Sequence, residues 1–266
     1  MNVVSLSVFD LTLAAGLVML MAILSYVMQL KMSQLIIVAA LRTVVQLLLI
    51  GFVLKWLFAQ ESFVWIAGMW TVMLLVAGRE IMARQTRRFK GLWGYGVGTV
   101  SVFISSFVVG IFVLTMVVNN TPWYTPQYAI PLMGMIIGNT MTASALSLES
   151  LTKTAWQQRM VIEARLALGQ SWRESIQDIA RQSIRIGLFP IVNAMAAAGL
   201  VNLPGMMSGQ ILGGTPPAEA VKYQILIMFM ITAASGFATL IAVWLGARHL
   251  FDERQRLSTN RLHTAK

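Results

Sequence analysis

Residues 92–118 read LWGYGVGTVSVFISSFVVGIFVLTMVV, a run of 27 positions without a single Asp, Glu, Lys or Arg. The hydrocarbon core of a bilayer is about 30 Å thick, and a helix that rises about 1.5 Å per residue crosses it in about 20 residues. Backbone groups inside lipid have no water to bond, so they must pair within their own segment. This run therefore predicts a membrane-spanning α-helix.

Further segments of similar length and character lie on both sides of this run. They cover residues 11–30, 32–54, 62–78, 129–148, 186–214 and 223–247. Only Arg42 brings a charge into any of them, while Pro190 and Pro204 interrupt the segment 186–214. The sequence therefore predicts an all-α polytopic membrane protein of about seven transmembrane helices, the sixth irregular, in a single domain over residues 1–266.

The composition agrees with this fold class and excludes several others. Hydrophobic residues make up 57% of the chain and charged residues 11%, whereas a soluble domain carries about 25% charged residues. The chain has 0 Cys, which excludes a disulfide framework, a zinc-thiolate site and an iron–sulfur cluster. It also lacks a Walker phosphate loop, a His-Glu-x-x-His motif and a pair of carboxylates within the spans, so neither ATP binding by this chain nor enzymatic activity is predicted.

The basic residues set an orientation, because loops rich in Lys and Arg stay in the cytoplasm. Of the 20 basic residues, 17 fall on one side of the predicted spans: Lys31, Arg79, Arg84, Arg87, Arg88, Lys90, Lys153, Arg159, Arg165, Arg173, Arg181, Arg185, Arg248, Arg254, Arg256, Arg261 and Lys266. The N-terminus is therefore predicted outside, and the C-terminus inside with a basic tail over residues 248–266. The net charge of +10 is attributed to topology and to contact with anionic membrane lipid, not to nucleic-acid binding.

The stretch 150–185, between the fifth and sixth predicted spans, is hydrophilic enough to face water. A first helix is expected over residues 154–168, ended by Gly169, which suits the left-handed conformation after a helix. A second begins with the capping-box pattern of Ser171 and Glu174 and continues with apolar residues at helical spacing. This amphipathic pattern fits a helix that lies on the bilayer surface, and it also fits a docking element for a soluble partner.

Within this hairpin, Glu163, Ala164 and Gly169 resemble in spacing the EAA motif of ABC-transporter permeases. Four stretches of the chain look like the FetB-type permease family: residues 40–47, 134–142, 162–169 and 202–214. The resemblance implies a permease domain that forms a homodimer in the bacterial inner membrane and works with two copies of a separate ATPase that binds the ATP. It also implies export of iron or of a related metal ion or chelate. It assigns the ATPase contact to Glu163, Ala164, Arg165, Gly169 and Ser171.

Polar side chains within the spans are candidates for a transport pathway. Arg42 is the most costly of them, since Arg at the middle of a span costs about 2.5–3.5 kcal/mol. Gln46 lies one turn away on the same face. The other candidates are Asn139, Thr142, Asn202 and Gln210. For Arg42, Asn139, Thr142 and Asn202, a role in holding helices together is the alternative.

Residues 204–214 contain one proline and four glycines. We expect them to form a broken helix or a re-entrant turn with free carbonyls, or else an apolar loop. Met206 and Met207 are either soft metal ligands or packing residues. No metal site is identified, because the predicted spans contain no Asp, Glu or His. A stand-alone secondary carrier or channel for a small ion is the alternative function, and a membrane scaffold that transports nothing is a third.

Overall fold

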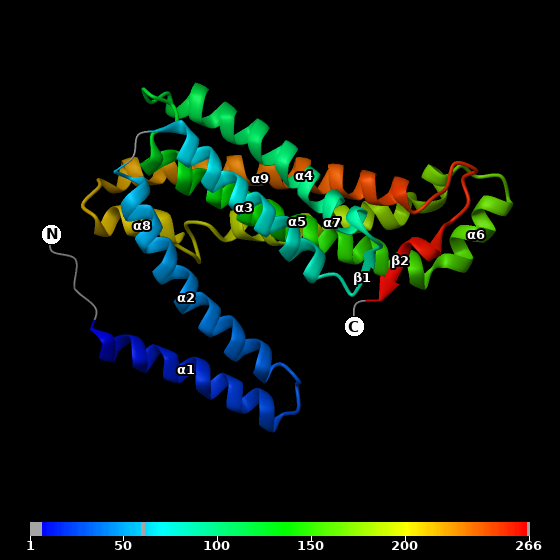
Figure 1. Ribbon diagram of the computed structural model, residues 1–266, viewed down its shortest axis with the longest axis horizontal. Coiled ribbons are helices and arrows are strands. Elements are labelled where there is room, and N and C mark those ends of the chain that lie inside the picture. Colours follow the sequence, from blue (N-terminus) through cyan, green and yellow to red (C-terminus); the bar gives the residue numbers. More distant parts are fainter. Residues whose placement is uncertain (1–6, 60–61, 265–266) are drawn as a thin grey trace. The chain divides into compact units, whose positions relative to one another are not determined.

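The computed structural model describes residues 7–59 and 62–264, nearly all of them in helices (Figure 1). Their contacts divide the chain into two compact units. Unit one comprises Met1–Glu61 with Leu212–Gly214, and unit two comprises Ser62–Ile211 with Thr215–Lys266. The expectation of a single domain over residues 1–266 stays a prediction, and its ends, including Lys266 of the basic tail, lie outside the described residues.

Unit one contains a helical hairpin of α1 (Val8–Val27) and α2 (Ser33–Leu57). Ser7 begins α1 through a capping box with Asp10, and Gln29 and Lys31 adopt positive φ angles in the turn between the helices. Most side chains of both helices are apolar and exposed. A helix that is apolar around its whole circumference belongs in lipid or in a protein interior.

Unit two is a bundle built around one central helix. Its long helices are α3 (Phe63–Ala83), α4 (Leu92–Phe112), which continues as a π-helix over Val113–Val118, α5 (Pro126–Gln157), α7 (Trp172–Ala197) and α9 (Pro217–His249). Short helices α6 (Arg159–Ala167) and α8 (Gly205–Leu212) and strands β1 (Arg87–Phe89) and β2 (Leu262–Thr264) complete it, with a 3₁₀ turn at Thr259–Arg261. Helix α5 contacts α3, α4, α7 and α9, and its residues Met133, Ile136 and Leu148 are fully buried.

Small side chains allow these helices to approach one another. In α9, Ala234, Ala238 and Ala242 follow at four-residue spacing and are fully buried. Helices in lipid gain no hydrophobic advantage from association, so close van der Waals contact over small residues and hydrogen bonds hold them together. One such bond joins the buried hydroxyls of Ser106 in α4 and Thr140 in α5, 3.1 Å apart.

Gly187 is the tightest point of α7 against its neighbours. A Cβ atom at this position would lie 2.7 Å from the carbonyl oxygen of Ala143 in α5 and 2.6 Å from Cγ2 of Thr239 in α9. Only a residue without a side chain fits where three helices meet this closely.

Six of the predicted spans are helices long and apolar enough to cross a membrane among the described residues: α1, α2, α3, α4 with its π-helical end, α5 and α9. The chain is therefore a multi-pass membrane protein. The seventh segment, 186–214, does not form a span of its own. Its first part is the apolar end of α7, which also carries the charged residues before 186, and the rest is a turn followed by α8.

One stretch is more regular than expected, and one expected helix boundary was wrong. Residues 204–214 are helical from Gly205 to Leu212, since a proline is well tolerated at the start of a helix. The backbone breaks fall at Gly199 and Gly214, both with positive φ angles. The first helix of the hairpin does not begin at 154, since α5 continues to Gln157 and α6 starts at Arg159.

We expect Gly187→Ala to lower the midpoint of thermal unfolding of the purified protein in detergent, because its methyl group would overlap backbone and side-chain atoms of two helices. Overpacking of this kind costs about 1–3 kcal/mol. Gly236→Ala in α9 is the matched control, because a Cβ there meets nothing within 4 Å. It should leave the midpoint unchanged or raise it, since Ala is favoured over Gly in helices by about 0.5–1 kcal/mol. Equal effects of the two variants would contradict the proposed packing.

Candidate coupling site at the α6–α7 hairpin

The turn between α6 and α7 has the geometry that the sequence predicts. Gly169 adopts a φ angle of +86°, and its N–H donates to the carbonyl of Leu166 at 3.0 Å. At the start of α7, the N–H of Ser171 donates to Oε2 of Glu174 at 2.8 Å, and the N–H of Glu174 donates to the Ser171 hydroxyl at 3.4 Å. The left-handed Gly169 and the capping box are thus confirmed.

Arg165 connects the two helices of the hairpin. Its Nη2 lies 3.1 Å from Oδ2 of Asp178 in α7, and its Nη1 donates to the carbonyl of Ser175 at 3.3 Å. Both side chains are partly exposed, and exposed ion pairs contribute at most about 1 kcal/mol. The contact therefore orients α6 against α7 more than it stabilises the fold, and it occupies a side chain that the sequence assigns to a partner.

The two faces of α6 differ in an unusual way. Ile162 is fully buried, whereas Met160, Val161 and Leu168 are 69%, 50% and 84% exposed. Met160, Ala164 and Leu168 follow at four-residue spacing and therefore share one face of the helix. Ala164 and Glu163 are exposed as well. We refer to Met160, Val161, Ala164 and Leu168 as the apolar stripe of α6.

The amphipathic pattern of α7 has a different explanation. Ser175, Ile176 and Ile179 are buried, and α7 packs against α5 and α9. The hydroxyl of Ser183 donates to the hydroxyl of Ser150 in α5 at 3.2 Å. The apolar face of α7 is therefore part of the core of unit two and is not available to lie on a bilayer.

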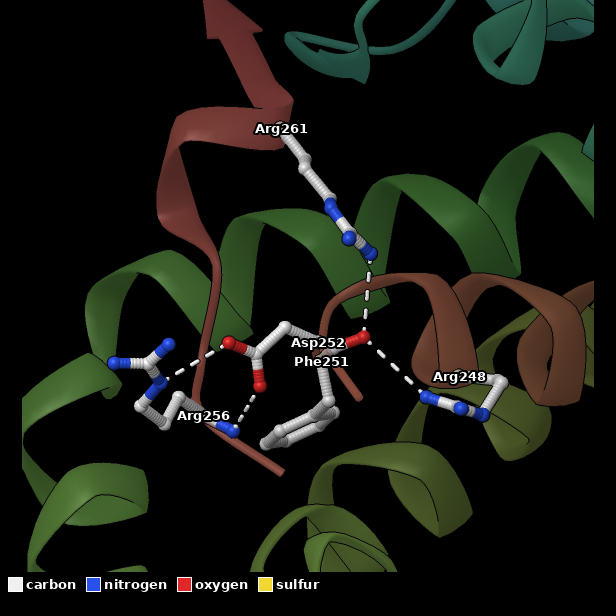
Figure 2. Close-up of polar contacts among 5 residues, drawn as sticks. All are labelled: Arg248, Phe251, Asp252, Arg256 and Arg261. Atoms are coloured by element: carbon white, nitrogen blue, oxygen red, sulfur yellow. Dashed lines mark hydrogen bonds and ion pairs between the residues drawn. The ribbon is translucent and has the colours of Figure 1, made fainter. Parts of the chain in front are cut away.

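Residues 250–264, which follow α9, fold back onto the hairpin as a clamp (Figure 2). The carbonyl of Phe251 accepts hydrogen bonds from Nη1 of Arg248 at 3.3 Å and from Nη1 of Arg261 at 3.2 Å. Nη1 of Arg261 also donates to the carbonyl of His249 at 2.8 Å. Two guanidinium groups thereby satisfy the carbonyls at the end of α9, where cations are favoured.

A second contact shapes the same clamp. The carboxylate of Asp252 accepts from the backbone N–H of Arg256 at 2.8 Å and from its Nε at 3.0 Å (Figure 2). These bonds, that of the backbone N–H first, lower the pKa of Asp252 below its ordinary value. The carboxylate thus closes a tight turn in the charged form.

The clamp holds the first residue of α7. The N–H of Trp172 donates to Oε1 of Gln255 at 3.2 Å. The Trp172 ring lies 5.8 Å from the buried ring of Phe251, and the Arg248 guanidinium lies 5.7 Å from the Trp172 ring. Trp172 thus contacts both the clamp, through Gln255 and Phe251, and the end of α9, through Arg248.

The loop between α3 and α4 joins the same cluster. Its strand β1 pairs antiparallel with β2 of the clamp, with Phe89 opposite Leu262. Just before β1, the N–H and the hydroxyl of Thr86 donate to the Glu149 carboxylate of α5 at 2.7 and 2.6 Å. The Arg87 guanidinium lies 4.0 Å above the Trp156 ring, next to the junction of α5 and α6. The β1 loop thus contacts both the clamp and the end of α5 that leads into the hairpin.

The expected pathway residues are distributed over both units of the chain. Arg42 and Gln46 lie on α2 of unit one and are exposed. The Asn139 amide and the Thr142 hydroxyl donate to carbonyls of their own helix, those of Met135 and Gly138, at 2.8 and 3.1 Å.

The remaining two pathway candidates lie beyond the end of α7. Asn202 belongs to the turn that follows this helix, and its carbonyl accepts from the N–H of Gly199 at 2.9 Å. Gln210 lies on α8, where its Oε1 is buried without a hydrogen-bond partner among the described residues. A role of Asn202 and Gln210 in transport stays a prediction.

Sequence reasoning missed the clamp. Its residues Phe251, Gln255 and Arg261 were counted only as part of a basic tail. One local signal was available, because Leu250 and Phe251 are apolar residues placed between the charges of that tail, and both are fully buried.

The family model described as "Uncharacterised protein family (UPF0014)" matches residues 8–251 of the chain. The chain belongs to this family. The match extends from the start of α1 to Phe251, and thus includes every helix of the hairpin and the bundle but not β2 of the clamp.

Relatives of known name cover most of the chain. It is 36% identical over 220 residues to "UPF0014 membrane protein slr1647" of Synechocystis, with 81% of this chain and 83% of that protein covered. It is 31% identical over 258 residues to "Probable iron export permease protein FetB" of Escherichia coli, with 95% of both covered. It is 31% identical over 247 residues to "Protein ALUMINUM SENSITIVE 3" of Arabidopsis thaliana, with 93% of this chain and 88% of that protein covered. No solved structure matches the chain.

We expect Arg261→Ala to release the clamp without unfolding the bundle. The variant removes a charged donor from two carbonyls, and a hydrogen bond to a charged group contributes about 1.5–3 kcal/mol. Hydrogen exchange should rise for backbone amides of residues 250–262 and stay unchanged in α5. Arg254→Ala, an exposed arginine of the same segment, is the control. Exchange that rises equally in both variants would show that Arg261 does not hold the clamp.

The capping box of α7 should weaken in acid. The Ser171 hydroxyl and, next, its N–H lower the pKa of Glu174 in the folded state. Its contribution is therefore complete above the ordinary pKa of a glutamate and is lost as the pH falls through the lowered value. Exchange of the amides of Ser171 to Ser175, corrected for intrinsic rates, should rise over this range. Glu174→Gln keeps a neutral acceptor and should remove the pH dependence, and a dependence that survives in this variant would assign it to another group.

Proposed function

We propose that this chain is the permease subunit of an ABC transporter, and that α6 is the element that docks into a separate ATPase subunit. The observation that carries the proposal is the apolar stripe of α6. It is exposed, whereas Ile162 of the same helix is buried and Arg165 is bound to Asp178 of α7. The start of α7 is in turn held by the clamp. An apolar surface that a chain leaves exposed beyond its own core is typical of a contact with another protein.

The charge distribution supports placing this hairpin in the cytoplasm. The hairpin, the β1 loop and the clamp carry most of the basic residues of the chain, and basic loops are retained on the cytoplasmic side. A homodimer with two ATPase subunits, in the inner membrane of a bacterium, would then present two hairpins to two ATPases.

The route by which ATP would drive the bundle follows from the contacts of the hairpin. Closure of the ATPase pair would move α6, and the Arg165–Asp178 contact would carry this movement to α7. Trp172 would carry it to the clamp and to α9. Such coupling requires that the ATPase bind more tightly to one conformation of the bundle than to the other.

Export of iron is proposed for this chain because FetB of Escherichia coli, which it resembles over 95% of its length, is named a probable iron export permease. Within the described residues, no group of three or more His, Cys, Asp or Glu is placed to hold a metal ion. We therefore favour a chelate, or an ion passed over backbone carbonyls, as the exported species.

Purification of the tagged chain from its own cells, followed by identification of any Walker-type ATPase that is purified with it, would test the docking role. The complex should form in equal amounts, and Leu168→Glu should weaken it about tenfold or more, since burial of a leucine contributes about 1.5–3 kcal/mol. Gln170→Glu adds the same charge two residues away, outside the stripe, and should change the affinity less than about twofold.

Three results would contradict the proposal: no association with any Walker-type ATPase, transport that persists without one, or Leu168→Glu binding as tightly as Gln170→Glu. Transport driven by an ion gradient alone would favour the stand-alone carrier.

A further inference from the structure

Unit two contains a cavity of about 470 Å³. Its walls come from the last turn of α7, the turn 198–204, α8 and the first half of α9. Three methionines line it, Met195, Met207 and Met228, together with the side chain of Gln224. The rest of the lining is aliphatic, aromatic or glycine, and no charged side chain takes part. The coupling proposal does not involve this cavity.

Gln224 is the polar group of the cavity wall. The residue is 8% exposed, and in the part of the chain that the structure describes its Oε1 is buried without a hydrogen-bond partner. Buried polar atoms are satisfied in the great majority of cases, and an unsatisfied one costs free energy. A bound molecule that donates a hydrogen bond to Oε1 would remove this cost.

The remaining wall restricts what kind of molecule can bind. A charged ligand would leave its charge unpaired in an apolar site, which is unfavourable. A single metal ion needs only a small cage of ligand atoms, whereas about 470 Å³ is within the range of sites for organic molecules, which are mostly apolar with a few polar groups. Met195 is already engaged, since its sulfur accepts from the Thr232 hydroxyl at 2.8 Å. Flexible thioethers adapt their shape to apolar ligands.

The exposed part of the cavity lining is apolar. Leu203, Ile225 and Phe229 are 60%, 49% and 63% exposed. Exposed lining of this composition favours an apolar ligand over a charged one.

We infer that this cavity binds a neutral, mostly apolar organic molecule that donates one hydrogen bond, from an O–H or N–H group, to Oε1 of Gln224. The inference does not rest on the proposed function, and its test needs no ATPase.

The probe is octanol with a photoreactive diazirine on its chain, and its methyl ether, which has the same shape but no donor, is the comparison. Full-length protein in lipid nanodiscs is labelled with each, and labelled residues are located by mass spectrometry. The alcohol should label residues 195–207 and 221–229 saturably, and excess unlabelled octanol should compete with it. Gln224→Leu should weaken labelling by the alcohol about three- to tenfold, the value of one neutral hydrogen bond. It should leave labelling by the ether unchanged.

Two further variants complete the test. Ala198→Phe fills the cavity from its wall and should abolish labelling there by both probes. Gln85→Leu is the matched control, because Gln85 is also a buried glutamine whose Oε1 has no partner among the described residues, but it lies outside the cavity. It should leave labelling by both probes unchanged.

Several outcomes would overturn the inference. Labelling that does not saturate would identify the cavity as ordinary lipid-exposed surface, and so would labelling that Ala198→Phe does not affect. A Gln224→Leu variant that loses alcohol and ether equally would assign the glutamine a structural role. Protection by Ag⁺ but not by octanol would indicate a thioether metal site, and exclusion of both probes would indicate that a second copy of the chain covers the cavity.

Discussion

The close approach of α4, α7 and α9 to the central helix α5 is the interaction on which unit two depends. In a bilayer, lipid tails solvate a leucine as well as another helix does, so helices associate only where their surfaces fit. The alanines of α9 and Gly187 of α7 provide this fit because they leave at most a methyl group between the backbones. The hydroxyls of Ser106 and Thr140 add a hydrogen bond between α4 and α5.

The hairpin is held by polar contacts and not by the close packing of small residues. There the contacts are ion pairs, cation–π contacts and hydrogen bonds from Arg248, Arg261 and Thr86. This difference between the two regions has a physical reason. Charged groups lose a large hydration free energy when they are removed from water, whereas small residues allow close helix packing in lipid. A bundle packed over small residues is thereby joined to a region held together by polar contacts. Two irregular stretches interrupt the regular helices of unit two: the π-helical end of α4 and the turn 198–204 after α7.

Much of the fold could be predicted from the sequence, because length and the absence of charge decide what crosses a membrane. The capping box of Ser171 and the left-handed Gly169 were equally predictable, since both depend on neighbouring residues alone. The clamp was not, because the bond from Trp172 to Gln255 joins residues 83 positions apart and β1 and β2 have only three residues each. The end of α5 at Gln157 depends on tertiary packing. The burial of Oε1 of Gln224 without a hydrogen-bond partner among the described residues depends on the packing of α7, α8 and α9, and no local sequence pattern indicates it.

Helix α9 runs without interruption from Pro217 to His249, about 50 Å at 1.5 Å per residue. Gln224 lies near its beginning, and Arg248, which contacts Trp172, lies at its end. A single uninterrupted helix thus connects the cavity around Gln224 to the hairpin. If a molecule in that cavity favours one orientation of α9, it would change the affinity of the hairpin for the proposed ATPase, and the ATPase would change the affinity of the cavity by the same factor.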